Sequence, residues 1–411
     1  MAETSDYSYR RIRPRAPGVY IEDVAPSQAA VLRTGVPVFV GFVQERVQTR
    51  AQREDKDVKF FRLTSWEQFE QPVGQAALRF LGYAVRGFFE NGGECCVVVP
   101  LEVRKDQRSL AALKEALGNI FTKDANGRRG LLEDIEDTDL VCVPDIMMEE
   151  IRESQETVFE LQQQVLEYCK DMGDRFAILD AFPLGDSKDI ERTIQHWQAL
   201  RPTEGALYFP WIQDRTGAWL PPCGHVAGIY ARTDAQIGVH KAPANAIVEG
   251  AMDLEVQLTD EDQSRLNEVG VNCLRSFPGR GIRVWGARTL SRQPNWRYVN
   301  VRRLFLTLVR WIEHNMHDLV FEPSGPPLWD RVRDRLGSYC STLFQRGALK
   351  GLRPAEAFFV KCDAETNPLE VRAAGQLICD VGLAPIMPAE FVVVRITQSA
   401  AGTTVTLPTG T

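Results

Sequence analysis

The sequence predicts an α/β fold, α+β over the whole chain, in which a central sheet domain precedes a C-terminal domain of helices and strands. The first observation is that short apolar runs, such as GVPVFVGFV at residues 35–43, alternate with segments of helical periodicity up to about residue 213. Strands that alternate with helices are typical of a mainly parallel sheet covered on both faces. The second observation is that the pattern after residue 290 becomes mostly helical, with two long amphipathic segments.

The core elements follow one another in a regular order. After GVPVFVGFV, the charged segment 44–62 is expected to form a surface loop, and residues 75–93 a helix that ends at Asn91 and two glycines. Further helical patterns cover residues 109–117, 148–172 and 188–200. The remaining buried-strand candidates are CCVVVP at 95–100, TDLVCVPD at 138–145, RFAILDAF at 175–182 and GALYFPWI at 205–212.

The rest of the chain divides into four further segments. Residues 1–34 form an N-terminal arm with a strand, and residues 214–290 a loop-rich connection with the short strands LEVQL (254–258) and GIRVWGA (281–287). Residues 291–398 form the C-terminal domain, with helices over 301–323 and 328–349, and residues 399–411 a polar tail. On the second helix, Arg331 and Arg335 share one face.

Charge and composition exclude several classes of protein. A formal net charge of −7 argues against a general nucleic-acid binder, because a basic surface is needed to neutralise phosphates. The local exception is a group of four arginines at positions 10, 11, 13 and 15, either a solvated tail or a basic arm for a protein partner. The nine cysteines form no CxxC pair, which favours reduced thiols and a cytoplasmic folding compartment. No signal peptide or long apolar stretch is visible, so membrane insertion is not expected.

Motifs for catalysis or metal binding are weak. His314 and His317 lie three residues apart beside Glu313, but the spacing is not HExxH, and two surface histidines on a helix are the preferred interpretation. The glycine-rich FPGRGIRVWG (277–286) leads into a strand pattern rather than a helix, unlike a phosphate-binding loop. The sequence therefore predicts no catalytic residues, no metal site, no cofactor and no enzyme activity.

Strand patterns stand near both ends of the chain. PGVYIEDV (17–24) and AEFVVVRITQ (389–398) are rich in strand-forming residues, and neither has a hairpin partner beside it. An unpaired strand exposes a row of hydrogen-bonding groups. From the pattern alone, the two strands either pair with each other within one subunit or add to sheets of other chains.

An ordered series of motifs resembles one known family. PGVYIEDV, YAVRGFFENGG (83–93), SFPGRGIRVWGARTL (276–290), WRYVNVRRLF (296–305), VFEPSGPPLWDRVR (320–333) and VGLAPIMPAEFVVVRI (381–396) occur in this order. Together they resemble the contractile tail sheath proteins of myophages, R-type bacteriocins and extracellular contractile injection systems, over almost the whole chain. One departure is Met387, which stands where the family pattern has a lysine.

The resemblance implies that the two terminal strands are exchanged between subunits and complete a small C-terminal sheet on a neighbour. It favours this arrangement over pairing within one subunit. The exchanged residues would be Val19, Tyr20, Ile21, Glu22, Phe391, Val392, Val393, Val394, Arg395 and Ile396.

The resemblance also implies a mechanical function. Subunits would polymerise as stacked hexameric rings around an inner tube and contract from a metastable extended state, which drives the tube through a target envelope. Candidate tube contacts are Arg331, Arg335, Arg372 and Gln376, the last two on an expected helix around residues 372–379. Besides itself and the tube, the expected partners are baseplate and terminal cap proteins and sheath paralogues, with no nucleic acid and no membrane insertion.

Assembly is expected in the bacterial cytoplasm, into a phage tail or a tail-like particle that is released or anchored to a membrane. Two alternatives remain. One is a non-contracting or minor sheath paralogue near the baseplate or cap of the same particle. The other is an α/β enzyme that binds a small ligand at the carboxyl ends of its strands.

Overall fold

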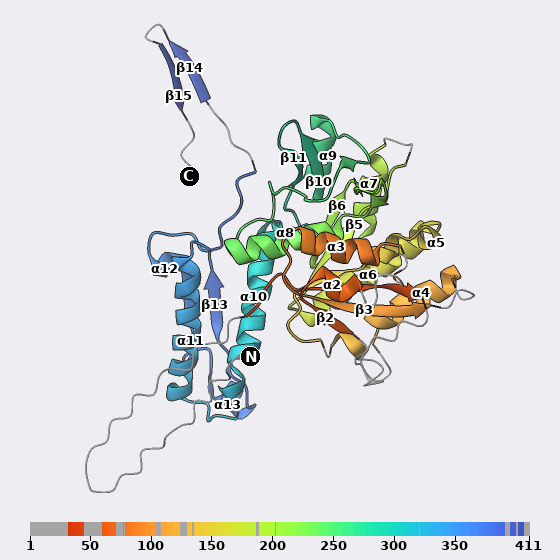
Figure 1. The fold of residues 1–411 in the computed structure, drawn as a ribbon. Helices are drawn as coiled ribbons and strands as arrows, with labels where there is room; N and C mark the ends of the chain where they lie inside the picture. Colours follow the sequence, from red (N-terminus) through yellow and green to blue (C-terminus); the bar gives the residue numbers. More distant parts are fainter. Residues whose placement is uncertain are drawn as a thin grey trace, which may run out of the picture. The chain divides into compact units, whose positions relative to one another are not determined.

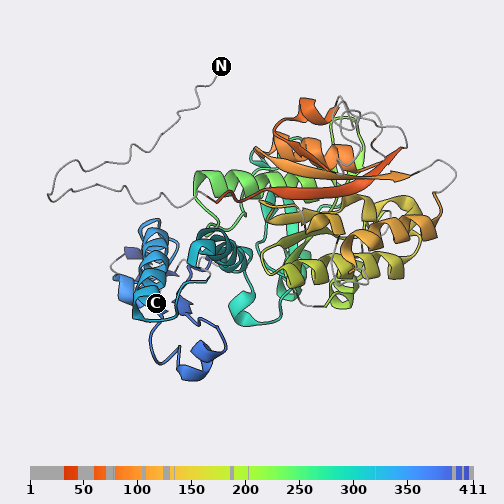
Figure 2. The ribbon, with the colours of Figure 1, turned by 90° about the horizontal axis from the view of Figure 1, so that it is seen from below.

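A computed structural model describes residues 32–44, 60–70, 77, 79–103, 108–123, 130–133, 135–185, 189–201, 203–319, 321–390, 395–399 and 402–406. The predicted α/β class is confirmed, because the largest element is an eight-stranded sheet with helices on both faces (Figure 1). Figure 2 shows the same arrangement from below, with the green helix on one side of the red and orange strands and the yellow helices on the other.

The central sheet is parallel except at its two edges. Its spatial order is β11-β10-β6-β5-β4-β1-β3-β2, and the six inner strands from β10 to β3 run parallel. The edge strands β11 and β2 are antiparallel to their neighbours. The strands are β1 Pro37–Gln44, β2 Phe61–Leu63, β3 Cys96–Val103, β4 Leu140–Cys142, β5 Phe176–Asp180, β6 Gly205–Phe209, β10 Val271–Phe277 and β11 Gly281–Trp285.

Successive side chains of each central strand point to opposite faces of the sheet, and helices cover both faces. Val38, Val40 and Phe42 of β1 enter one apolar cluster, while Phe39 and Val43 enter the other. The first cluster is covered by α4 Leu110–Phe121, α5 Glu149–Arg152, α6 Gln155–Met172, α7 Glu191–Ala199 and α9 Asp260–Val269. The second is covered by α2 Trp66–Phe69, α3 Leu81–Glu90, α8 Cys223–Gln236 and the start of α10 Val299–Asn315.

Most expected core elements form, and two of them differ from the prediction. The helical pattern over 148–172 divides into α5 and α6, because Ser154 takes an extended conformation and its side chain accepts a hydrogen bond from the Thr157 amide as a helix cap. The predicted loop over 44–62 ends in β2, which pairs with β3. Both changes leave the order of the main strands unaltered.

The region predicted to be loop-rich, residues 214–290, contains α8 and α9 as well as β10 and β11. The short strands β7 Ile212–Gln213, β8 Trp219–Leu220 and β9 Asp253–Leu254 form a separate small sheet, so LEVQL contributes only its first residue to a strand. Helix α8 packs closely against α3 because of its glycines. A Cβ atom at Gly224 would lie 2.2 Å from the Ala84 carbonyl oxygen, and one at Gly228 would lie 2.4 Å from that of Phe88.

The C-terminal region packs two long helices against a small sheet. Helices α10 and α11 Pro326–Gln345 bury Leu308, Trp311, Trp329 and Val332 in one apolar cluster. The other elements of this region are η6 His317–Leu319, α12 Pro354–Ala357, β12 Phe358–Lys361, α13 Leu369–Ala373 and β13 Asp380–Leu383. Three 3₁₀ turns lie earlier in the chain: η3 Gly130–Leu132, η4 Pro144–Met147 and η5 Pro294–Trp296. Near the C-terminus, β14 Arg395–Ser399 pairs in an antiparallel manner with β15 Gly402–Thr406.

Candidate assembly interface

A buried arginine joins the C-terminal region to the core. Nη1 and Nη2 of Arg303 on α10 lie 2.9 and 2.6 Å from the two carboxylate oxygens of Asp234, and Nη2 also lies 2.9 Å from Oδ2 of Asp139. The guanidinium lies over the ring of Tyr230 at 4.9 Å. Burial lowers the pKa of Arg303, but Asp234 and Asp139 outweigh it, so the pKa is raised and the group stays cationic. Two carboxylates therefore hold one end of α10 against the core.

The segment that leads toward the N-terminal arm is fastened to the same joint. Asp139 accepts hydrogen bonds from the backbone amides of Gly35 at 3.0 Å and Val36 at 2.7 Å. Further along α10, Nη1 of the buried Arg310 donates to the carbonyl oxygen of Arg33 at 3.1 Å. The position where this arm leaves the body is thus set by α10 and its partners.

The segment that leads toward the C-terminal strand is fastened in a similar way. Nδ2 of Asn300, in the first turn of α10, donates to the carbonyl oxygens of His240 at 2.8 Å and Ile386 at 3.0 Å. Four residues later, Glu390 receives two hydrogen bonds from Arg288, one from Nε at 2.9 Å. The described residues next to both arms, 33–36 and 386–390, are therefore anchored to α10 and the core.

The small sheet of β12 and β13 has no further strand at either edge among the described residues. The two strands pair in register from Phe358 opposite Leu383 to Lys361 opposite Asp380. Phe359 lies on the outer face, 59% exposed, with its ring over Gly382, where a Cβ atom would lie 2.1 Å from it. Unpaired strand edges beside an exposed aromatic ring are suited to strand addition.

The predicted exchange residues are only partly within view. Residues 19–22 and 391–394 lie outside the described residues. Arg395 and Ile396 belong to β14, where they pair with Thr406 and Val405 of β15. In the ranges that can be followed, β14 and β15 form a sheet of their own. Exchange of strands between subunits therefore stays a prediction.

Two of the predicted tube-contact residues lie together on α11, each with an acidic partner. Nη2 of Arg331 lies 2.9 Å from Oε2 of Glu322. Both terminal nitrogens of Arg335 bind Asp318, at 2.6 and 2.7 Å, and this hydrogen-bonded pair lowers the pKa of Asp318. The two arginines thus sit in a surface network of alternating charge beside the α10–α11 connection.

The other two predicted contacts occupy different surroundings. The Arg372 guanidinium lies 5.8 Å from the centre of the Trp329 ring on α11. Gln376 is exposed and follows α13, which ends at Ala373, so the prediction of a helix around residues 372–379 is wrong for residues 374–379. Gly375 ends it with a φ of +70°. Arg372 is therefore beside α11, while Gln376 lies in the loop before β13.

Sequence reasoning missed several exposed apolar side chains of the C-terminal region. Phe321 is fully exposed at a φ of +70°, and Leu352 and Leu369 are 93% and 72% exposed. A lone apolar residue in a polar loop gives no signal in the sequence, because its exposure depends on the path of the chain. Single apolar residues on a surface are common in soluble proteins, so these three do not by themselves mark an interface.

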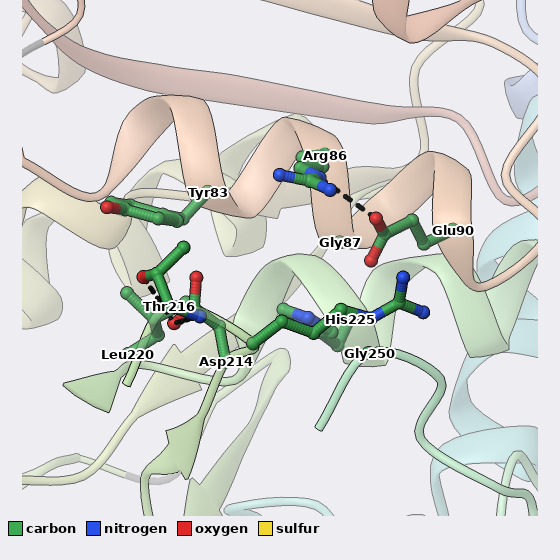
Figure 3. A pocket seen from close by; sticks show the side chains of 10 residues that line it. Tyr83, Arg86, Gly87, Glu90, Asp214, Thr216, Leu220, His225 and Gly250 are labelled. Atoms are coloured by element: carbon green, nitrogen blue, oxygen red, sulfur yellow. Dashed lines mark hydrogen bonds and ion pairs between the residues drawn. The ribbon is translucent and has the colours of Figure 1, made fainter. Parts of the chain in front are cut away.

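A small polar pocket lies between α3, α8 and the turn after β7 (Figure 3). It has a volume of about 100 Å³, and its lining includes the Arg86–Glu90 ion pair and Asp214. Burial lowers the pKa of His225 to about 4, so its ring is neutral at pH 7, and Nδ1 has no hydrogen-bond partner among the described residues. Asp214 accepts from Thr216 and Ala218. The carboxylates of this pocket already have partners, which argues against a catalytic pair here.

Carboxylates at the ends of two central strands bind backbone amides at the starts of helices. Asp145 accepts from the amides of Phe42, Phe80 and Leu81, at 2.7 to 3.2 Å, and Asp180 from the amide of Cys223 at 2.8 Å. Burial raises the pKa of each to about 7. Perturbed carboxylates at this edge are typical of enzymes, but these are enclosed and bound to the start of α3 and α8.

The described residues contain neither a metal-binding cluster nor a membrane-spanning helix. No three His, Cys, Asp or Glu side chains there come together as a metal site, and His314 and His317 are exposed on the α10 end. Among the same residues, no helix combines the length and apolarity required to cross a membrane.

Family models match consecutive parts of the chain. The model of the phage tail sheath protein central domain matches residues 131–290, and that of the phage tail sheath C-terminal domain matches residues 291–399. The tail sheath protein of Vibrio phage KVP40 is 24% identical over 186 residues, 44% of this chain and 27% of that protein. That of Burkholderia phage BcepMu is 29% identical over 171 residues, 38% and 34% of the two chains. The matches thus span about a quarter to a third of these curated relatives.

Solved structures match over nearly the full length of both chains. The sheath of the extracellular contractile injection system PVC, in its contracted state, is 30% identical with a TM-score of 0.70, covering 95% of this chain and 99% of that one. The contracted helical sheath of the anti-feeding prophage is 30% identical with a TM-score of 0.71, covering 94% and 100%. A chain of the contracted anti-feeding prophage baseplate is 27% identical with a TM-score of 0.77, covering 94% and 100%. The chain belongs to the phage tail sheath protein family.

Proposed function

We propose that this chain is the subunit of a contractile sheath, which polymerises as stacked hexameric rings around an inner tube and shortens to drive that tube through a target envelope. The observation that carries the proposal is the similarity to two contracted sheaths at 30% identity over 99–100% of their chains. The role is structural and mechanical rather than enzymatic, in agreement with carboxylates and a pocket that are already satisfied within the fold.

Strand addition links the subunits. In this mechanism the strand 391–396 of one copy, and the strand 19–22 of another, add to the open edges of β12 and β13. A hydrogen bond contributes roughly 1 kcal/mol net, so about five bonds and a few buried apolar side chains give a joint of several kcal/mol. Arms anchored by Arg310 and Arg288 hold their starting points while the intervening segments reorient.

Contraction moves each subunit as a body between two lattices. The Arg303 joint keeps the C-terminal region and the core together during this movement. The energy comes from the greater subunit contact of the contracted lattice, and a kinetic barrier preserves the extended one. The sequence contains no GxxxxGK[ST] motif for nucleotide binding, so the energy for contraction is not expected to come from nucleotide hydrolysis by this chain.

Other components complete the particle. Arg331, Arg335, Arg372 and Gln376 are proposed to face the inner tube, and baseplate and cap proteins close the two ends. Assembly takes place in the bacterial cytoplasm, into a phage tail or tail-like particle that is released or held at a membrane.

The proposal is tested with the purified full-length chain under the electron microscope. Wild-type protein is expected to form long tubes, whereas Val393→Pro, which removes a strand donor, leaves soluble folded subunits. Val393→Ile is the matched control and keeps tube formation. Tubes of normal length from the proline variant, or from a chain that lacks residues 1–24, would rule out strand exchange as the linkage.

A second candidate is a minor or non-contracting sheath paralogue near the baseplate. The similarity to a chain of the contracted anti-feeding prophage baseplate, with a TM-score of 0.77, supports this second candidate. Such a subunit would not polymerise alone beyond a short stack, whereas a major sheath subunit forms tubes of indefinite length. The distribution of tube lengths therefore separates the two.

A further inference from the structure

Two cysteines face each other at the end of the β12–β13 sheet. The register places Lys361 opposite Asp380, and in an antiparallel pair the next residues outward, Cys362 and Cys379, are also opposite each other. Opposite residues in such a pair have Cα atoms roughly 4.5 or 5.5 Å apart, and both distances lie within the range of about 4.4–6.8 Å found in disulfides.

The side chains of the two cysteines lie on the same face of the sheet. Both belong to the apolar cluster that also contains Val360 and Val381, each two residues further along its strand. Burial is the main cause that raises the pKa of both thiols, that of Cys379 to about 12, and each thiol also affects the pKa of the other, as expected for close neighbours. The sulfur atoms are therefore neighbours rather than merely close in the backbone.

A buried asparagine fixes this end of the sheet. Asn367 has no exposed surface, and its amide binds both the backbone amide of Ile378 at 2.7 Å and its carbonyl oxygen at 2.9 Å. Its Nδ2 also lies 3.9 Å from Sγ of Cys362. Asn367 thus ties the residue before Cys379 to Cys362 itself.

Access distinguishes this pair from the other thiols. Of the nine cysteines, all of them within described ranges, eight are buried and Cys379 is partly exposed. Cys142 and Cys223 also lie near each other, but both are enclosed in the core. Among the nine cysteines, only a pair that includes Cys379 contains a partly exposed residue, where a reagent in solution can approach.

We infer that Cys362 and Cys379 form a redox-sensitive thiol pair that closes into a disulfide when the chain meets a low-molecular-weight disulfide such as oxidised glutathione. The Cys379 thiolate attacks one sulfur of the reagent, forms a mixed disulfide and releases one glutathione thiolate. The Cys362 thiolate then attacks Sγ of Cys379, breaks the mixed bond and releases the second glutathione. The two cysteine protons end on the two released thiols, so the cysteines are oxidised and the reagent is reduced.

The disulfide would close the loop 363–378, which carries α13. Thiols stay reduced in the cytoplasm and meet oxidising conditions outside the cell, so closure would follow release of a particle. Arg372 and Gln376, the proposed tube contacts, lie in this loop, so closure would restrict their movement in the sheath. An effect on tube contact depends on the proposed function, whereas formation of the disulfide does not.

Trypsin and mass spectrometry give a direct test. Arg372 lies between the two cysteines, so trypsin separates peptide 362–372 from peptide 373–395, each with one cysteine. Reduced full-length protein is incubated with oxidised glutathione at about pH 9, because the raised pKa of Cys379 leaves very little thiolate at neutral pH. It is then alkylated and digested. The expected product is these two peptides joined by a disulfide, with two fewer alkylated cysteines than in the reduced protein.

Two variants make the outcome specific. Cys362→Ser is expected to stop at a glutathione adduct on Cys379, and Cys340→Ser, which removes another thiol close to Cys379, is expected to keep the linked peptides. A link between Cys340 and Cys379, or a persistent glutathione adduct in the wild-type protein, would overturn the inference, as would full alkylation of both cysteines after the incubation.

Discussion

Arg303 and Asp139 are 164 residues apart in the sequence, yet Nη2 of the arginine lies 2.9 Å from Oδ2 of the aspartate in the interior of the protein. The same guanidinium holds Asp234, so one cation compensates two buried carboxylates. Since a buried charge is costly without its partner, this joint determines whether α10 remains on the core.

Replacement of Arg303 by methionine is therefore expected to be strongly destabilising. The variant leaves Asp139 and Asp234 buried without their cation, and the expected loss is about 3–5 kcal/mol in the free energy of unfolding. Arg331→Met is the matched control, because the Arg331–Glu322 pair is largely exposed and contributes at most about 1 kcal/mol. Urea denaturation of both variants provides the comparison, and equal losses would contradict the role of Arg303.

Two helix glycines are expected to respond in opposite directions to the same substitution. Gly228→Ala places a methyl group 2.4 Å from the Phe88 carbonyl oxygen and should cost about 1–3 kcal/mol, since α3 and α8 must move apart. Gly337→Ala, in α11, meets no atom within 4 Å among the described residues outside its own helix, and should stabilise by about 0.5–1 kcal/mol. Thermal unfolding of the two proteins gives the sign directly, and destabilisation by both would argue against this packing.

His225 should make the protein sensitive to acid. Its pKa falls from 6.5 in the unfolded chain to about 4 in the fold, because burial disfavours the charged ring. Between these values the unfolded state binds more protons, so stability is lost as the pH falls from about 6.5 to 4, by up to about 3 kcal/mol.

The measurement for this prediction is a difference between two proteins. The stability of wild type minus that of His225→Gln should decrease as the pH is lowered, while contributions from other groups, such as the buried His196, cancel. A difference that stays constant from pH 7 to pH 4 would show that His225 does not titrate in this way.

Phe359 should matter for assembly and little for the isolated subunit. The ring is 59% exposed on β12, so Phe359→Lys is expected to change the free energy of unfolding by less than about 1 kcal/mol, whereas a charge on an open sheet edge opposes strand addition. Met252→Lys, at a 63% exposed position near β9, is the control. Light scattering should show slow or absent polymerisation for the Phe359 variant alone, and normal polymerisation of both would count against the β12–β13 sheet as an interface.

Uninterrupted apolar runs made the inner strands predictable, because residues such as Val38 and Phe39 are buried on both faces of a parallel sheet. Strand β10 was missed since Asn272 and Arg275 interrupt its pattern, and their partners, Arg288 and Asp260, come from other parts of the chain. Helix α8 was missed for another reason. Pro221, Pro222 and Gly224 at its start are typical of a loop. In the fold, Gly224 and Gly228 instead allow close contact with α3.

The candidate interface was less predictable than the fold. Arg302 and Arg303 are adjacent and chemically identical, and only the packing shows that Arg303 is buried between two aspartates while Arg302 pairs with the partly exposed Glu204. Arg331 and Arg335 were placed on one face by helical spacing, but their acidic partners lie in a separate loop. Contacts between distant segments depend on the tertiary structure, which local patterns do not contain.

The most direct test of strand exchange is a cryo-electron microscopy reconstruction of tubes formed by the wild-type chain. The account predicts continuous density from Glu390 of one subunit into a strand that hydrogen-bonds to β12 or β13 of another copy. Density that returns residues 391–396 to the β12–β13 sheet of their own subunit, with no strand from a neighbour, would contradict it.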